Sequence, residues 1–424
     1  MRILHLVPRY APAVGGSETH MAKLSEYLVA QGHEVVVATS DSLDFTVIWR
    51  GDGRRIEQTQ QTINGVEVRY FRTEHLPLSR YIYPALRRLL WGISHMGGTD
   101  VAMGLCRFTP YLPDLYRWLE TTAESFDLIA AMGISFEPLF VAGQRAAQKR
   151  GIPFVAYPLT HFGAGETPGA DILSRFYTMP YQTELIVRSD MLLAQTQAEA
   201  DYYIGHGMER SKVTIAGPGF DPEEIPDGDA GRWREKYQIA ADAPVILTMS
   251  SLNYDKGTPY LIEAVRQLWQ ADQDVVLAIA GNPQPDFQRY FERLPADVRS
   301  RLLMLGHITD MEKRDVLAAA QIFAMPSRTD SFGIVYLEAW YAGLPVVGAE
   351  TWGVMNDVIR EGENGRLVPY GDGDRLASVL GELIADPAEC ARLAANGRAF
   401  AVGEHTWGHK QKITADVYER LVAE

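Results

Sequence analysis

Apolar and polar positions along the chain fall into blocks that predict alternating strands and helices. An apolar run at 3–7 is followed by a Gly-rich turn, a helical pattern over 17–31 and a second apolar run at 35–38. Both runs are apolar at successive positions rather than at every second one, which is typical of strands covered on both faces. We therefore expect a parallel sheet with helices on each side.

The same blocks return in the second half of the chain and indicate a second doubly wound α/β unit. Hydrophobic periodicity there predicts helices at 259–271, 310–320 and 334–342, and strands at 244–250, 275–280, 302–305, 322–325 and 346–347.

A segment rich in Pro, Gly and Asp, 218–229, separates the two blocks and has the composition of a linker between domains. We therefore predict a first domain over 1–222 and a second over 223–404. The end of the chain, 405–424, reads as a helix that packs back on the first domain. Its apolar side chains recur at helical spacing, at Trp407, Ile413, Val417 and Leu421.

One long segment, 76–126, does not follow the alternation. Between Arg69 and Trp118 the chain has seven arginines and three acidic residues, although its formal net charge is −14. We interpret the segment as a helical insertion with solvated arginine faces. The sharper alternative is an acceptor pocket, or a contact with a membrane surface through 80–118. A lipid-linked or anionic acceptor is suggested by Arg80, Arg87, Arg88 and Trp91.

Length and composition exclude some classes of function. A chain of 424 residues exceeds one ordinary core, so two domains are expected. Its acidic balance argues against nucleic-acid binding, and Cys106 and Cys390 form neither a disulfide framework nor a metal-binding spacing. The first apolar run stops at Pro8, too short for a signal peptide, and no run approaches a membrane span. We expect a cytoplasmic protein, and any peripheral membrane contact would be at the inner face of the membrane.

A glycine pair lies between the first predicted strand and the first predicted helix, in Gly15-Gly16-Ser17-Glu18. Glycines let the backbone approach a ligand closely, and a helix start presents free N–H groups and the positive end of the helix dipole. A phosphate or sugar oxygen would suit this position. A plain strand–helix turn with Ser17 as the N-cap explains the motif equally well.

The segment 326–339 connects a predicted strand to a predicted helix in the second half. The helix begins near Phe332-Gly333, so its first N–H groups would face the crevice above the sheet, where a diphosphate binds in such folds. Asp330 precedes the helix and Glu338 lies in its early turns. Two carboxylates at this spacing suit the hydroxyls of a sugar and a ribose, although a capping acid and a surface Glu would look the same.

Several short motifs in this order and spacing resemble family 4 of the retaining glycosyltransferases, which have the two-domain GT-B fold. The resemblance covers nearly the whole chain. Its motifs are Gly15-Gly16-Ser17-Glu18, Gly32-His33-Glu34-Val35, Gly217-Pro218-Gly219-Phe220-Asp221, Lys256-Gly257, 326–339, Gly343-Leu344-Pro345-Val346-Val347 and Asn364-Gly365-Arg366-Leu367-Val368-Pro369. It implies two Rossmann-like doubly wound domains facing across a cleft, the first binding the acceptor and the second the nucleotide-sugar.

The resemblance also implies a set of site residues. Asp330, where the family usually has Glu, would contact sugar hydroxyls, Glu338 the ribose, and Lys256 the diphosphate. His161 follows an apolar run and matches a family His near the donor sugar. The candidate catalytic residues are His161, Lys256 and Asp330. The candidate donor-binding residues are Gly15, Gly16, Ser251, Ile308, Ser331, Phe332, Gly333, Ile334, Val335 and Glu338.

One departure weakens the match at the diphosphate. Ser251 stands where the family has an Arg, which removes one positive charge from the leaving group. Arg9, after the first strand, is a candidate substitute. No paired acids have metal spacing, so we expect no metal and no cofactor, with a nucleoside diphosphate sugar as the co-substrate.

The resemblance implies retaining transfer by front-face attack, in which a leaving phosphate oxygen takes the acceptor's proton. UDP is the default base by its frequency in the family, and GDP and ADP stay open. The sugar stays open too, as does the acceptor, which is a lipid-linked molecule, a small metabolite or a glycan. The alternatives are another GT-B enzyme, such as a nucleotide-sugar epimerase, and a non-catalytic nucleotide-sugar-binding protein. An NAD-dependent oxidoreductase is disfavoured because Gly15-Gly16 lacks the Gly-x-Gly-x-x-Gly spacing.

Overall fold

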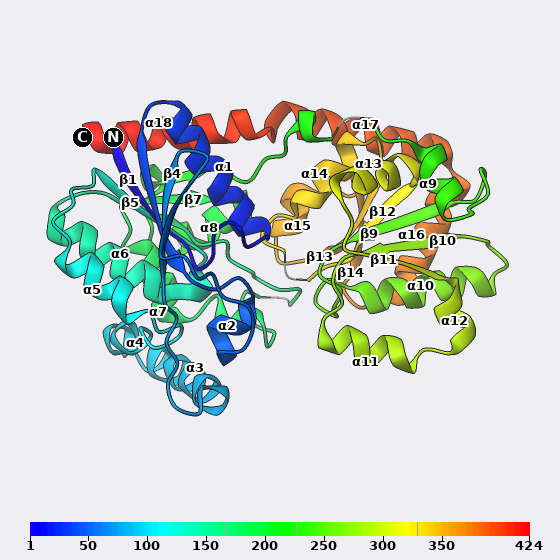
Figure 1. Ribbon diagram of the computed structural model, residues 1–424. Helices are drawn as coiled ribbons and strands as arrows, with labels where there is room; N and C mark the ends of the chain where they lie inside the picture. Colours follow the sequence, from blue (N-terminus) through cyan, green and yellow to red (C-terminus); the bar gives the residue numbers. More distant parts are fainter. Residues whose placement is uncertain (166, 226, 329) are drawn as a thin grey trace. The chain divides into compact units, whose positions relative to one another are not determined.

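The chain forms two compact α/β units, each built on one sheet (Figure 1). The computed structural model describes residues 1–165, 167–225, 227–328 and 330–424. We call the two units N-terminal and C-terminal. The N-terminal unit comprises Met1–Phe162, Pro168–Pro218 and Gly408–Glu424, and the C-terminal unit comprises Gly163–Thr167 and Gly219–Trp407.

Within its described residues, the N-terminal unit has an eight-stranded sheet in the order β3-β4-β2-β1-β5-β6-β7-β8. Neighbouring strands are parallel except β3 and β4, which form an antiparallel pair. The strand order reverses direction between β1 and β5, so the loops that follow the strands meet at a topological switch point. The strands are β1 Arg2–Leu6, β2 Glu34–Ser40, β3 Gln60–Ile63, β4 Val66–Phe71, β5 Leu128–Met132, β6 Phe154–Tyr157, β7 Met191–Ala194 and β8 Val213–Ile215.

Helices cover both faces of this sheet, as the unbroken apolar runs predict. On one face, α1 and α18 pack on alternate strand residues such as Val37 and Ala130. On the other, Gly143 of α6 lies so close to Leu6 and Phe154 that a Cβ there would be 2.7 Å from each. The helices are α1 Gly16–Ala30, α2 Phe45–Arg50, α3 Ser79–His95, α4 Thr99–Leu105, α5 Pro113–Thr121, α6 Glu137–Arg150, α7 Pro180–Val187, α8 Gln197–Gly205 and α18 Trp407–Ala423.

The C-terminal helix α18 is anchored in the N-terminal unit's core by its aromatic side chain. Tyr418 is fully buried, and its hydroxyl lies 2.9 Å from the Tyr157 hydroxyl and 3.2 Å from His5 Nε2. The two strand residues come from β6 and β1. The helix therefore packs on the sheet that begins the chain.

The irregular segment forms helices α3, α4 and α5, and one of its arginines points inward. Arg87 is buried and donates to Glu137, which also accepts from the Tyr181 hydroxyl. Arg87 additionally donates to Phe176 O at 3.2 Å. The inclusion of Arg87 in an exposed acceptor-binding or membrane-binding face is therefore wrong, because its guanidinium is buried and already paired with the Glu137 carboxylate.

The C-terminal unit has a parallel sheet in the order β11-β10-β9-β12-β13-β14. Its direction of progression reverses between the neighbours β9 and β12. The five strands expected from hydrophobic periodicity are all present, with ends that agree to within three residues, and among the described residues β14 is a sixth strand that periodicity did not indicate. The strands of the unit are β9 Val245–Met249, β10 Val276–Ala280, β11 Leu302–Gly306, β12 Ile322–Met325, β13 Val346–Glu350 and β14 Gly365–Pro369.

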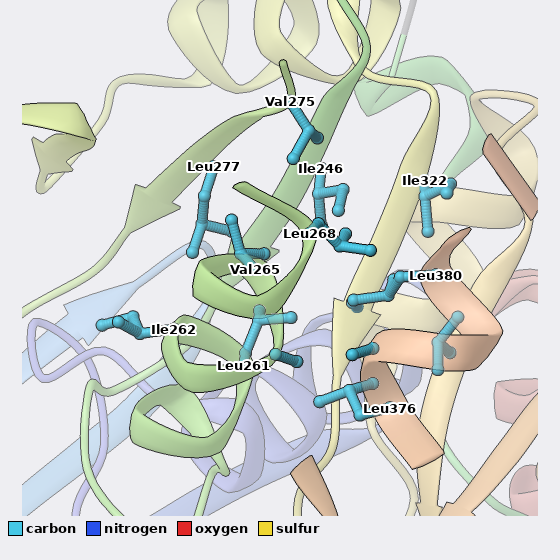
Figure 2. Packing of buried hydrophobic residues seen from close by; sticks show 14 of the residues in the cluster. Ile246, Leu261, Ile262, Val265, Leu268, Val275, Leu277, Ile322, Leu376 and Leu380 are labelled. Atoms are coloured by element: carbon cyan, nitrogen blue, oxygen red, sulfur yellow. The ribbon is translucent and has the colours of Figure 1, made fainter. Parts of the chain in front are cut away.

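One face of this sheet is covered by α10 and α16, whose leucines interdigitate with the strands (Figure 2). Leu261 and Leu268 of α10 and Leu380 of α16 belong to one buried cluster with Ile246 and Ile322 of the strands, all at 5% exposure or less. Such burial stabilises the unit by roughly 1.5–3 kcal/mol per large aliphatic side chain. The helices are α9 Ala230–Lys236, α10 Thr258–Gln270, α11 Pro285–Arg293, α12 Ala296–Arg301, α13 Asp310–Ala319, α14 Ile334–Tyr341, α15 Val354–Val358, α16 Gly373–Ala385 and α17 Pro387–Glu404.

Candidate active site

A lysine and an aspartate meet at the switch point of the C-terminal unit. Lys256 lies in the loop after β9, and Asp330 lies in the loop after β12, the neighbouring strand. Lys256 Nζ is 2.5 Å from Asp330 Oδ1, and the two side chains are 21% and 12% exposed. The predicted lysine thus lies over the carboxyl ends of the strands, where open α/β sheets bind ligands, and does not extend into solvent.

The two loops that carry this pair are fastened to each other. Arg328 donates to Asp255 Oδ1 through Nη2 at 2.7 Å and through Nε at 3.0 Å, and its backbone N–H donates to Asp255 O at 2.9 Å. Gly257 has φ +75°, and a Cβ there would overlap Pro326 O. Sequence reasoning missed Arg328 and Asp255, although they are close neighbours of the two predicted side chains. These contacts between the two loops restrict the positions that the Lys256 and Asp330 side chains can take.

Helix α14 begins at this site with its first N–H groups free of any side-chain cap in the described structure. Its N-cap is Gly333 at φ 87°. The helix start is held from below, because the Tyr336 hydroxyl donates to Met325 O at 2.5 Å and Phe332 is 3% exposed. The backbone N–H groups of Ile334 and Val335 lie in the first turn, where the helix dipole favours an anion.

Glu338, the second predicted carboxylate, has a cation that the sequence did not reveal. Lys313 Nζ on α13 donates to Glu338 Oε1 at 2.9 Å, with side chains 25% and 17% exposed. Each acid of the predicted pair is therefore matched by one lysine. Ser251 is exposed in the loop after β9, and Ile308 follows β11, so both also lie at this edge of the sheet, as does Ser331 in the loop before α14.

In the N-terminal unit, the glycine pair opens α1 beside a buried ion pair. Arg9 Nη2 is 2.5 Å from Glu18 Oε1, with side chains 6% and 3% exposed. A Cβ at Gly15 would press against the Glu18 carboxylate, so Gly15 is required by this packing, whereas Gly16 is open and exposed. Ser17 is not the N-cap, because the helix begins at Gly16 and the Ser17 hydroxyl donates to Glu18 Oε2 at 2.8 Å.

The proposed substitution of Arg9 for the missing family Arg is not favoured by this arrangement. The guanidinium already faces a carboxylate, donates to Leu43 O at 3.0 Å and lies 3.5 Å over the Phe45 ring. Its charge is compensated within the N-terminal unit. The first-turn carboxylate of Glu18 also occupies part of the positive end of α1.

His161 lies four residues after the end of β6, as expected from the sequence. Its ring packs against the Tyr177 ring at a centroid distance of 4.6 Å. The preceding residues are constrained, since Leu159 has φ +51° and the Thr160 N–H donates to the buried Glu199 at 2.6 Å. Sequence reasoning missed Glu199, which lies 38 residues away on α8.

Outside positions 166, 226 and 329, no helix is both long and apolar enough to cross a membrane. Over the same described part of the chain, no three His, Cys, Asp or Glu side chains are grouped to hold a metal ion.

Two protein-family models match consecutive parts of the chain. Residues 15–219 match a glycosyl transferase 4-like domain, and residues 229–400 match glycosyl transferases group 1. Their boundary falls in the Pro- and Gly-rich segment that joins the two units.

Curated relatives match over part of their length. A D-inositol 3-phosphate glycosyltransferase of Xylanimonas cellulosilytica is 32% identical over 56% of this chain and 58% of its own. A GDP-mannose-dependent alpha-(1-6)-phosphatidylinositol monomannoside mannosyltransferase of Mycolicibacterium smegmatis is 34% identical over 45% of this chain and 52% of its own. The chain therefore spans about half to three fifths of these relatives.

Solved structures share the fold over the whole chain. HepE of Anabaena, crystallised in complex with UDP, has a TM-score of 0.70 at 20% identity and covers 99% of this chain and 100% of its own. Sucrose-phosphate synthase of Thermosynechococcus elongatus has a TM-score of 0.72 at 18% identity and covers 100% of both chains. At this level of identity the likeness establishes the architecture of two parallel-sheet α/β domains.

Proposed function

Since this chain belongs to family 4 of the glycosyltransferases and has the GT-B fold, we propose that it transfers a hexose-type sugar from a nucleoside diphosphate sugar to an acceptor. Transfer proceeds with retention at the anomeric carbon and without a metal. The C-terminal unit binds the donor, and the N-terminal unit binds the acceptor.

The observation that carries the proposal is the Lys256–Asp330 pair beside the start of α14, at the switch point of the C-terminal sheet. A diphosphate bound there meets an ammonium group and free helix N–H groups, both of which favour negative charge. The carboxylate of Asp330 accepts hydrogen bonds from sugar hydroxyls once the lysine turns to the phosphate. Glu338 faces the ribose in the same way.

The proposed chemistry needs no covalent intermediate on the protein. The bond between the anomeric carbon and the leaving phosphate oxygen breaks, and the acceptor oxygen bonds to the same face of that carbon. The acceptor's proton passes to the departing phosphate oxygen, so charge and atoms balance. Lys256 and the α14 N–H groups stabilise the charge that develops on the diphosphate, where each such preorganised donor supplies roughly 2.7–4 kcal/mol.

For the donor we favour UDP-hexose, with GDP- and ADP-sugars as alternatives. HepE was crystallised with UDP, whereas the Mycolicibacterium relative is named for GDP-mannose. A thermal-shift screen with the three sugar nucleotides decides among them, because a ligand that binds only the folded state at 100 times its Kd stabilises it by about 2.7 kcal/mol. A rise in Tm with one base identifies the donor, and no rise with any of them contradicts donor binding.

A non-catalytic nucleotide-sugar-binding protein is the competing function, favoured by Ser251 in place of the family Arg and by the prior engagement of Arg9. Slow hydrolysis of the stabilising sugar nucleotide by the wild type, measured as release of free sugar, supports the enzyme. Release of an isomerised sugar nucleotide instead identifies an epimerase. Tight binding without any turnover supports the binding protein.

For the acceptor we propose a lipid-linked or anionic molecule reached through the helical insertion at the membrane face. Arg80 and Arg88 on α3 are exposed and form no ion pair among the described residues. Co-sedimentation with vesicles tests this. The wild type is expected to bind anionic vesicles and not neutral ones, and R80E/R88E is expected to lose the binding to anionic vesicles. Equal binding by the variant would contradict the proposal. The exposed large apolar side chains of the same region are Leu78, Tyr81, Leu89, Trp91, Met96 and Val101.

A further inference from the structure

The loop that carries His161 leaves its strand through a left-handed residue. Leu159 has φ +51°, a conformation that residues with a branched side chain adopt reluctantly. The backbone just before it is held, because Tyr157 O accepts from the Gly133 N–H at 2.9 Å and Pro158 O accepts from the Ile134 N–H at 2.8 Å. A bend of this kind persists only if the residues after it are held as well.

Glu199 supplies that hold from α8. Its side chain is 1% exposed, and its Oε1 accepts from the Thr160 N–H at 2.6 Å while its Oε2 accepts from the Gln195 N–H at 2.7 Å. Each oxygen of this buried carboxyl group thus accepts a hydrogen bond from a backbone N–H group, and hydrogen bonds to a carboxylate are stronger than those to a neutral acceptor. A second contact joins the same elements, since the Thr160 hydroxyl lies 2.9 Å from the Tyr203 hydroxyl.

From these contacts we infer that Glu199 is a positioning residue for His161. It fixes the Thr160 backbone so that the left-handed bend at Leu159 aims the histidine ring along one direction, against Tyr177. The inference rests on the proposed function and on the family resemblance, which implies that His161 lies near the donor sugar. Glu199 itself touches no substrate and acts through the backbone.

The bend makes the inference testable by rescue. In Glu199→Gln, one of the two backbone N–H groups faces an amide NH2 instead of an acceptor, so the turn at Thr160 loosens. Leu159→Gly removes the cost of the left-handed bend, because glycine adopts positive φ freely. The double variant is therefore expected to recover the conformation that the single variant Glu199→Gln loses. A matched control is Glu124→Gln, which breaks contacts with Arg2 and Arg69 at the amino-terminal edge of the same sheet.

Two measurements on the full chain decide the matter. By NMR, Thr160 amide exchange is expected to be roughly tenfold faster in Glu199→Gln and to be unchanged in the control. In the donor assay, kcat is expected to fall on the order of 10- to 100-fold with the donor KM changed less than about threefold, and most of kcat returns in the double variant.

The outcomes separate this inference from the proposed function. Unchanged Thr160 exchange, an equal kcat loss in the control, or no recovery in the double variant overturns the role of Glu199. If the wild type turns over no donor, the proposed function fails. The exchange measurement then still decides whether Glu199 holds the bend, and unchanged exchange in Glu199→Gln overturns the inference by itself.

Discussion

Replacing Lys256 by methionine removes the ammonium group while keeping most of the side chain's volume. In the proposed reaction this leaves the departing diphosphate with only the helix N–H groups of α14. Loss of one preorganised donor of charge costs about 2.7–4 kcal/mol in transition-state stabilisation, and each 1.36 kcal/mol is tenfold in rate. We therefore expect kcat/KM to fall roughly 10²- to 10³-fold.

The same substitution leaves Asp330 without its lysine, so stability must be measured beside activity. The Lys256 and Asp330 side chains are 21% and 12% exposed, so the pair is neither fully exposed nor fully buried. A surface pair contributes about 0.2–1 kcal/mol to stability, and breaking a buried pair costs about 3–5 kcal/mol. We expect a loss of roughly 1–3 kcal/mol in the free energy of unfolding. In a unit of this size that lowers Tm by about 2–4 °C per kcal/mol, which leaves the protein folded at assay temperature.

The assay is steady-state kinetics with the donor found by the thermal-shift screen, together with urea unfolding of each variant. The control is Lys236→Met. It breaks a comparable contact, in which Lys236 Nζ lies 2.6 Å from Glu312 Oε1, and the Lys236 side chain is 51% exposed. It should leave kcat/KM unchanged. If K256M keeps at least a third of the wild-type kcat/KM, Lys256 does not stabilise the leaving group and the reasoning from its position is refuted.

Three further predictions concern stability. Burial lowers the pKa of His5 to about 3 and of His20 to about 4, so these folded-state histidines resist protonation while the unfolded chain takes up protons below pH 6.5. The contribution of the two neutral histidines to the free energy of unfolding is complete above pH 6.5 and is lost as pH falls toward 3–4. Together they lose roughly 4 kcal/mol by pH 5. Unfolding curves that do not change between pH 7.5 and 5 would contradict this prediction. Gly257→Ala should lower the free energy of unfolding by about 2–4 kcal/mol, because φ is +75° and the added Cβ meets Pro326 O. Chemical unfolding measures this, and a stability equal to the wild type would show that the loops carrying Gly257 and Pro326 separate freely. Arg87→Met should cost about 3–5 kcal/mol by the same measurement because the buried Glu137 side chain loses its cation. A loss below about 1 kcal/mol would mean that Glu137 finds another partner.

The alternation of strands and helices was predictable because it depends on local burial. A strand such as β9, covered on both faces, must be apolar at successive positions, and the structure places it at 245–249 inside the expected 244–250. The helix start at Gly333 was predictable for a similar local reason, since the glycine takes the left-handed N-cap that ends the loop after β12. The strand and the helix start each depend only on residues close together in the sequence, so a short sequence motif is enough to predict them.

The charge partners of the site were not predictable, because they join residues far apart in the chain. Lys313 and Glu338 are 25 residues apart on different helices, and the Thr160 N–H and Glu199 are 39 apart. Arg87 looked like one more arginine of an exposed basic face until the packing of its helix turned it onto a buried carboxylate. Hydrophobic periodicity and local turn geometry therefore define the elements, their order and the family, whereas the partner of each charged side chain depends on how the sheets bring separate loops to one edge. Electrostatic energy falls with distance in space and carries no trace in local sequence, so only the folded arrangement decides which acid meets which base.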